Sequence, residues 1–241
     1  MGPELVSALI KVPDQALKSS WGYLPNDLVI GKILDNNQNR QQGEIQATRE
    51  YVKLLFGNLH TPAADQAFKA LVANPLEKWW FPSAEKTLAE GLKSLDAVAN
   101  EIKRGGLKAP GDPETLAKVL GLADSQLAAE EDLLTSPNLG AFATDDRFCH
   151  AQGVARVADE AIKGALASFA EAVDRRGARP DLEAALQSLD HAARLDPFII
   201  IGGSPDGMTA NHLLILAYDL TRARVALDRA REKLAAGIEL P

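Results

Sequence analysis

Apolar residues recur at intervals of three and four along most of the chain, which is the spacing that places them on one face of an α-helix. Helix boundaries are marked by capping residues followed by proline, as at Thr61-Pro62 and Asp112-Pro113, and by glycines such as Gly57 and Gly121. These signals predict helices over about 5–17, 45–57, 61–74, 83–105, 112–121, 148–175, 180–194 and 209–236.

No long segment alternates apolar and polar residues, as a half-buried strand would. The one candidate strand, PFIIIGGSPDG at 197–207, is too short to support a sheet, so we interpret it as an extended segment that ends in a turn. The predicted fold class is all-α, a multi-helix bundle of about seven or eight helices with long irregular polar loops. We expect a single helical domain over 1–241, with a possible division into two layers near 134–146.

The last predicted helix has the most regular apolar spacing, which amounts to three heptads. Its apolar residues, here called the C-terminal seam, are Leu213, Leu216, Leu220, Ala223, Leu227, Ala230 and Leu234. The neighbour of this seam is either another helix of the same chain, which we favour, or a second copy. In the second case the protein would be a homodimer through the 213–234 seam.

One stretch departs from the helical pattern. The segment LPNDLVIGKILDNNQNRQQG, at 24–43, is rich in Asn, Asp and Gln, which compete with the backbone for hydrogen bonds and favour turns and caps. It predicts either a hydrogen-bonded structural cluster, which we favour, or a ligand site. We further expect 35–43 and the turn at 202–212 to meet at one polar centre. There Asn36, Asn39 or Gln42 would reach the turn, and Asn211 or His212 would reach back.

Composition and charge exclude several classes of protein. A formal net charge of −7 argues against nucleic-acid binding, and the 5% aromatic content suits a helical core better than a sheet. The single Cys149 permits no intrachain disulfide, and the four histidines lack metal-ligand spacing, so no metal and no cofactor are predicted. The N-terminus is too polar for a signal peptide, and no apolar run reaches the ~18 residues of a membrane span.

Five stretches, taken in order, resemble one protein family. They are 21–28 (WGYLPNDL), 34–43 (LDNNQNRQQG), 79–86 (WWFPSAEK), 145–153 (DDRFCHAQG) and 196–223 (DPFIIIGGSPDGMTANHLLILAYDLTRA). Together they resemble the bacterial family catalogued as domain of unknown function 2333. Three residues depart from its pattern: Cys149 stands where an aromatic is usual, Arg40 replaces an apolar residue and Gly202 replaces an asparagine.

The resemblance implies a location but no activity. Members of the family are envelope proteins, commonly tethered by an N-terminal membrane helix, and we expect that such an anchor has been removed before Met1. The expected location is therefore the periplasmic side of the inner membrane, with the cytoplasm as the alternative.

Two functions remain open. The first is a non-enzymatic helical module of the bacterial cell envelope that binds a protein partner or a small ligand through the polar stretch. The second is a hydrolase that uses Asp27, Asp35 or Asp146 as general base, with His150 or His212. The candidate ligand-binding residues are Asn26, Asp27, Asp35, Asn36, Asn39, Gln42, Trp80, Asp146, His150, Asn211 and His212.

Overall fold

A computed structural model of the protein describes residues 1–19, 32–73, 84–107, 111–136, 141–197, 200 and 211–236. Within these ranges the chain forms nine α-helices, one π-helical turn and no β-strand, which confirms the predicted all-α fold. The elements are α1 Pro3–Leu17, α2 Lys32–Phe56, α3 Pro62–Phe68, η1 Lys69–Ala73, α4 Ala84–Lys103, α5 Pro113–Thr135, α6 Ala141–Ser168, α7 Ala170–Arg175, α8 Arg179–Arg194 and α9 His212–Ala236.

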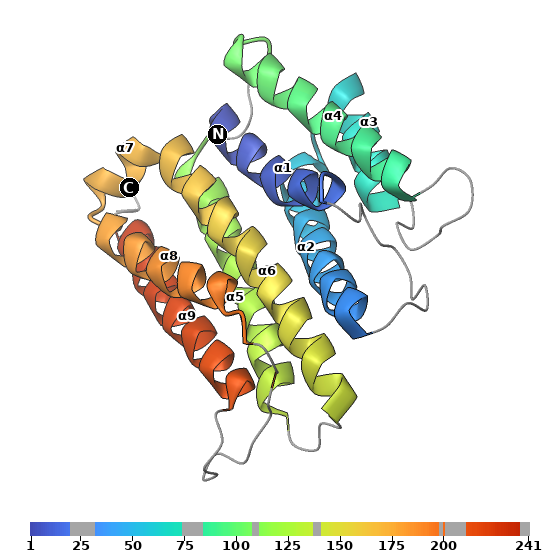
Figure 1. The fold of residues 1–241 in the computed structure, drawn as a ribbon. Helices are drawn as coiled ribbons and strands as arrows, with labels where there is room; N and C mark the ends of the chain where they lie inside the picture. Colours follow the sequence, from blue (N-terminus) through green and yellow to red (C-terminus); the bar gives the residue numbers. More distant parts are fainter. Residues whose placement is uncertain are drawn as a thin grey trace.

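Helix α6 forms the centre of the bundle. Figure 1 shows α1 and α2 along one side of it and α8 and α9 along the other, while α5 packs against both α6 and α9. Helices α3 and α4 form an outer pair, in which α4 packs against α1. Because α6 is surrounded, its buried residues lie on several faces, and most are small: Ala151, Val154, Ala155, Ala158, Ala161, Ile162 and Ala165.

The backbones of α2 and α6 are in close contact where the two helices cross. A Cβ added to Gly43 would lie 2.2 Å from the carbonyl oxygen of His150, and a Cβ added to Gly153 would lie 2.1 Å from the carbonyl oxygen of Arg40. Each glycine therefore faces the backbone of the other helix, and no side chain fits between them. Gly164 plays the same role further along α6, where an added Cβ would lie 2.8 Å from the Cα of Leu5 in α1.

The C-terminal seam packs inside the chain, as favoured above. All seven of its residues are buried, and α9 packs against α5 and α8. The neighbours of the seam within the chain are thus α5 and α8, and the homodimer through 213–234 stays an untested alternative.

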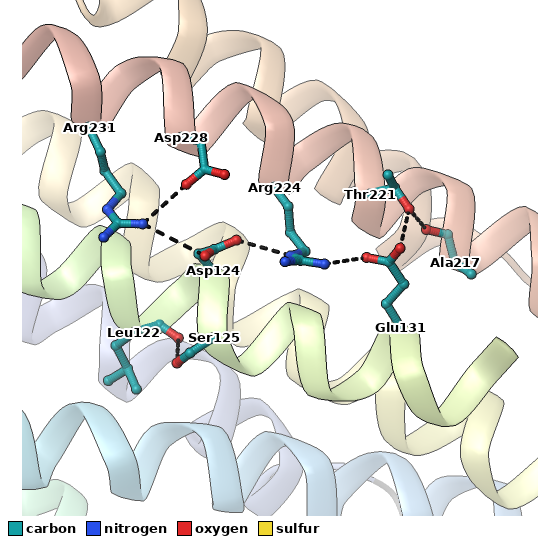
Figure 2. A network of polar contacts seen from close by, with 9 residues as sticks. All are labelled: Leu122, Asp124, Ser125, Glu131, Ala217, Thr221, Arg224, Asp228 and Arg231. Carbon is teal, nitrogen blue, oxygen red and sulfur yellow. Dashed lines mark hydrogen bonds and ion pairs between the residues drawn. The ribbon is translucent and has the colours of Figure 1, made fainter. Parts of the chain in front are cut away.

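A network of ion pairs fixes α9 against α5 (Figure 2). The Arg224 guanidinium donates to Asp124 at 3.0 Å and to Glu131 at 2.7 Å, and the pKa of Arg224 is raised chiefly by the hydrogen bond to Glu131. The Thr221 hydroxyl lies 2.8 Å from Glu131, while Arg231 pairs with Asp124 at 3.7 Å. All of these charges are partly exposed, so the network orients α9 more than it stabilises the fold.

The predicted bounds of two helices were wrong. Gly121 does not end a helix, because α5 continues from Pro113 to Thr135 with Leu120, Ala123 and Leu127 buried on one face. The long sixth helix begins at Ala141 rather than near Phe148, and it breaks at Phe169 before the short α7. The possible division into two layers near 134–146 coincides with the end of α5 and the start of α6, and it stays a prediction.

The prediction of an irregular loop over 35–43 was also wrong. The segment is helical throughout and belongs to α2. Its long polar side chains face neighbouring helices: Gln38, Gln41 and Glu44 are all buried. Tertiary packing thus overrides the local preference of Asn and Gln for turns. The candidate strand and most of the 202–212 turn lie outside the described residues.

The membrane criterion can be applied to the described helices. None of them combines the length and the apolar character needed to cross a bilayer.

The α2–α6 crossing yields the first prediction. Gly153→Ala should lower the free energy of unfolding by roughly 1–3 kcal/mol, because the new methyl group collides with backbone that cannot move aside. Gly121→Ala is the control, since its Cβ would meet only the Arg231 side chain at 3.5 Å. Alanine there should stabilise α5 by roughly 0.5–1 kcal/mol. Urea unfolding measures the free energy of unfolding of both variants. The same change in that free energy for Gly153→Ala and Gly121→Ala would show that α2 and α6 are not in backbone contact.

Candidate functional site

The crossing of α2 and α6 brings three of the predicted site residues together. The Asn39 side chain on α2 donates to the Asp146 carboxylate on α6 at 2.7 Å. His150 lies one turn further along α6, on the same helical face as Asp146. The polar stretch therefore contacts the start of the 145–153 segment, whereas the sequence analysis paired it with the turn at 202–212.

His150 is held by two other helices rather than by Asp146. Its Nδ1 lies 3.1 Å from the Glu130 carboxylate on α5, and its Nε2 lies 3.3 Å from the side-chain oxygen of Gln46 on α2. Both ring nitrogens therefore have partners, and neither is open to a substrate. This arrangement joins three helices and gives no support to His150 as a general base.

The other predicted residues that the structure describes lie at different positions on α2 and at the start of α9. Asn211 caps α9 by accepting a hydrogen bond from the Leu214 amide at 3.1 Å, and His212 is the first residue of that helix. Asn36 and Gln42 are half-buried on α2. Asp35 belongs to α2, but its side chain lies outside the described residues, as do Asn26, Asp27, Trp80 and the 202–210 part of the expected polar centre.

A polar cavity of about 150 Å³ lies beside the crossing, between α1, α2 and α6. Its polar lining consists mainly of Gln15, Asn37, Arg40, Gln41, Glu44 and Arg156. Within this α1–α2–α6 cavity the Glu44 side chain is only 2% exposed and forms an ion pair with Arg156. Arg156 also donates to the side-chain oxygen of Gln15 at 3.1 Å.

Of the charged side chains in the cavity, Arg40 alone has a buried polar atom that lacks a hydrogen-bond partner among the described residues. One of its terminal nitrogens donates to the side-chain oxygen of Asn37. Its Nε is buried and has no hydrogen-bond partner, and Arg40 forms no ion pair within the part of the chain that the structure describes. A buried donor of this kind needs an acceptor.

Glu44 has an unusual acidity. Burial raises its pKa from 4.5 to about 7, although the charges of Arg156 and Arg40 act in the opposite direction. Desolvation therefore outweighs the attraction of the two guanidinium groups. Near neutral pH this carboxyl exists in both protonation states.

A second concavity, of about 480 Å³, lies between α8 and α9. Its lining, which defines the α8–α9 groove, is Gln187, Ser188, His191, Leu214, Ile215, Tyr218, Asp219 and Arg222. His191 Nδ1 lies 2.6 Å from the Asp219 carboxylate. The Asp219 side chain is 6% exposed whereas that of His191 is 61% exposed, so a buried carboxylate holds an open imidazole.

The outer face of α9 continues the groove. Ile215, Tyr218 and Val225 are spaced by three and seven residues, and their exposed fractions are 38%, 62% and 47%. The Arg222 guanidinium lies 5.7 Å from the centre of the Tyr218 ring, a cation–π distance. Among the described residues Arg222 has no ion-pair partner. This face of the helix thus presents apolar surface and the positive charge of Arg222 to solvent.

The sequence prediction missed both the cavity and the groove. Glu44 could have been found, because it lies on the same helical face as Thr48, Tyr51 and Leu55, which are buried. His191 and Asp219 are 28 residues apart on different helices, so no local pattern joins them.

The described residues contain no group of three or more His, Cys, Asp or Glu side chains placed to hold a metal ion. No protein-family model, curated protein or solved structure matches the chain. The resemblance to the family of unknown function therefore stays a prediction.

The acidity of Glu44 predicts a specific pH dependence of stability. Because its folded pKa lies above its unfolded value, its contribution is fully present below about pH 4.5 and is lost as the pH rises to about 7. A rise from 4.5 to about 7 corresponds to roughly 3 kcal/mol. The Glu44→Gln variant has a neutral side chain at every pH. Its free energy of unfolding, minus that of the natural protein, should therefore increase by roughly 3 kcal/mol as the pH rises from 4.5 to about 7.

The measurement is urea unfolding of both proteins from pH 4.5 to 8. Glu50→Gln, which removes a more exposed carboxylate of the same helix, is the control for the loss of one charge. A difference between Glu44→Gln and the natural protein that does not change with pH would contradict the prediction.

Proposed function

We propose that the protein is a non-enzymatic helical binding module of the bacterial cell envelope, and that it binds a helical segment of a partner protein in the α8–α9 groove. The envelope location rests on the family resemblance alone, with the periplasmic side of the inner membrane as the expected place. The binding proposal rests on one observation, the exposed apolar face of α9 beside an open groove.

The shape of the groove suits a helix. Two packed helices leave a groove between them into which the side chains of a third helix can fit. Leu214, Ile215 and Tyr218 would supply apolar contacts at helical spacing. An aromatic residue and an arginine at the centre of such a surface are the residue types that contribute most to binding energy.

The charge of the groove indicates the chemistry of the partner. Arg222 lacks an ion-pair partner among the described residues, and the exposed edge of His191 lies on the same surface. A partner helix with an apolar face flanked by a carboxylate would pair with Arg222 and cover the Tyr218 ring. The Arg224 network holds α9 on α5 and so keeps the groove-forming face outward.

Site-specific cross-linking followed by binding measurements tests this proposal. A photoreactive phenylalanine analogue replaces Tyr218 in the protein's native cells, and the captured protein is then purified and titrated with defined variants. Ile215→Ala should weaken its binding by about tenfold or more, as expected for a central contact. Leu54→Ala is the matched control, because Leu54 on α2 has the same exposed fraction of 38%, and it should leave affinity unchanged.

Two results would contradict the proposal. Equal loss of affinity in the Ile215→Ala and Leu54→Ala variants would show that the groove is not the binding surface. A cross-linked product made of two copies of this chain would show that the groove mediates self-association instead.

The hydrolase alternative has one observation in its favour. The buried Asp219 carboxylate orients His191, as a supporting carboxylate orients the histidine base of many hydrolases. No hydroxyl or thiol donates to His191 within the described residues, and Ser188 donates instead to the carbonyl of Ala184. Hydrolysis of a p-nitrophenyl ester that is abolished by His191→Gln, in a variant with unchanged melting temperature, would favour the enzyme over the binding module.

A further inference from the structure

The α1–α2–α6 cavity has more charge than its internal contacts balance. It contains the guanidinium groups of Arg40 and Arg156 and one carboxyl, that of Glu44. Glu44 pairs with Arg156, whereas Arg40 has no carboxylate partner in the described part of the chain. With Glu44 ionised, the cavity therefore has a net charge of +1.

The unpaired charge coincides with an unpaired hydrogen-bond donor. Arg40 Nε is buried and has no acceptor among the described residues. Leaving such a donor unsatisfied is unfavourable, and a molecule bearing acceptor oxygens would remove that cost by accepting its hydrogen bond. The cavity of about 150 Å³ has room for about five water molecules at roughly 30 Å³ each, or for an organic anion of a few non-hydrogen atoms.

We propose that the α1–α2–α6 cavity binds a small monocarboxylate anion, with Arg40 as its principal ligand. Arginine presents a planar set of donors that matches the two oxygens of a carboxylate. At pH 8, where Glu44 is mostly ionised, one negative charge balances the net charge of the cavity, whereas the phosphate dianion would leave excess negative charge beside Glu44. The amide side chains of Gln15 and Asn37 add neutral polar groups to the wall.

The acidity of Glu44 supports this assignment. Its neighbours in the cavity are Arg40 on its own helix, Arg156 on α6 and the uncharged Gln15 on α1. Because its pKa is about 7, Glu44 can take up a proton when an anion enters and so avoid like-charge repulsion. Binding of a carboxylate should therefore tighten as the pH falls from 8 to 6.

The test is a titration of the full chain with sodium acetate at constant ionic strength, with sodium chloride making up the balance. Acetate should bind saturably, with a dissociation constant of roughly millimolar order for a ligand this small. In proton–nitrogen spectra the Arg40 Nε–H signal should move with acetate, while that of Arg222, far away on α9, should not.

Two variants that each remove one positive charge, one inside the cavity and one outside it, are compared. Arg40→Gln should weaken acetate binding by about tenfold or more, and Arg222→Gln should leave it within about twofold. If Arg40→Gln does not fold, Arg40→Lys serves in its place, because it keeps the charge and removes the Nε donor. Inorganic phosphate is the second probe, compared with acetate at pH 8, where Glu44 is mostly ionised and phosphate should bind more weakly than acetate.

Three results would overturn the proposal. They are the absence of a saturable acetate response, an equal response of the Arg40 and Arg222 signals, and phosphate binding at least as tight as that of acetate. None of them bears on the α8–α9 groove, so the two proposals fail or survive separately.

Discussion

The backbone contact between α2 and α6 at Gly43 and Gly153 is the constraint on which the polar interior depends. Because each glycine faces a carbonyl of the other helix, the helices are closer here than side chains would allow. Side chains on either side of the crossing are consequently forced together. Asn39 meets Asp146, and Glu44 meets Arg156, within about a turn or two of the glycines. A wider spacing would separate these pairs and admit water between them.

Close packing also explains the raised pKa of the Glu44 carboxyl. Glu44 lies where α1, α2 and α6 converge, and its side chain is 2% exposed. The exposed ion pairs between α5 and α9 in Figure 2 involve similar residues, but solvent screens them and they mainly orient the helices. Pairs of arginine and carboxylate thus behave differently on the two sides of α6. Deep burial shifts the pKa of Glu44, whereas the partly exposed pairs between α5 and α9 mainly orient the helices.

Much of the fold could be predicted from the sequence, because helical periodicity and caps are local signals. The C-terminal seam is buried as its spacing indicates, and Asp112 caps α5 as expected. Local signals failed where distant partners decide the outcome. The polar 35–43 stretch is helical because its long side chains find partners on other helices, and Gly121 lies within a helix that packing sustains. The contact of Asn39 with Asp146 and the pair of His191 with Asp219 each join two helices that are distant in sequence, so no local pattern in either helix indicates them.

The charged cavity is not something that the fold requires. Elsewhere the bundle is held by alanine and leucine, as between α8 and α9, where Leu189, Leu216 and Leu220 are buried. Replacing a buried ion pair by apolar residues of similar volume is often neutral or stabilising, because the charges must be desolvated. Burying Glu44 and leaving the Arg40 Nε without an acceptor among the described residues therefore act against stability. Glu44 and the Arg40 Nε lie beside a cavity large enough for a small molecule, and their burial weakens the fold. Binding of a ligand therefore explains these charged groups better than a role in stability does.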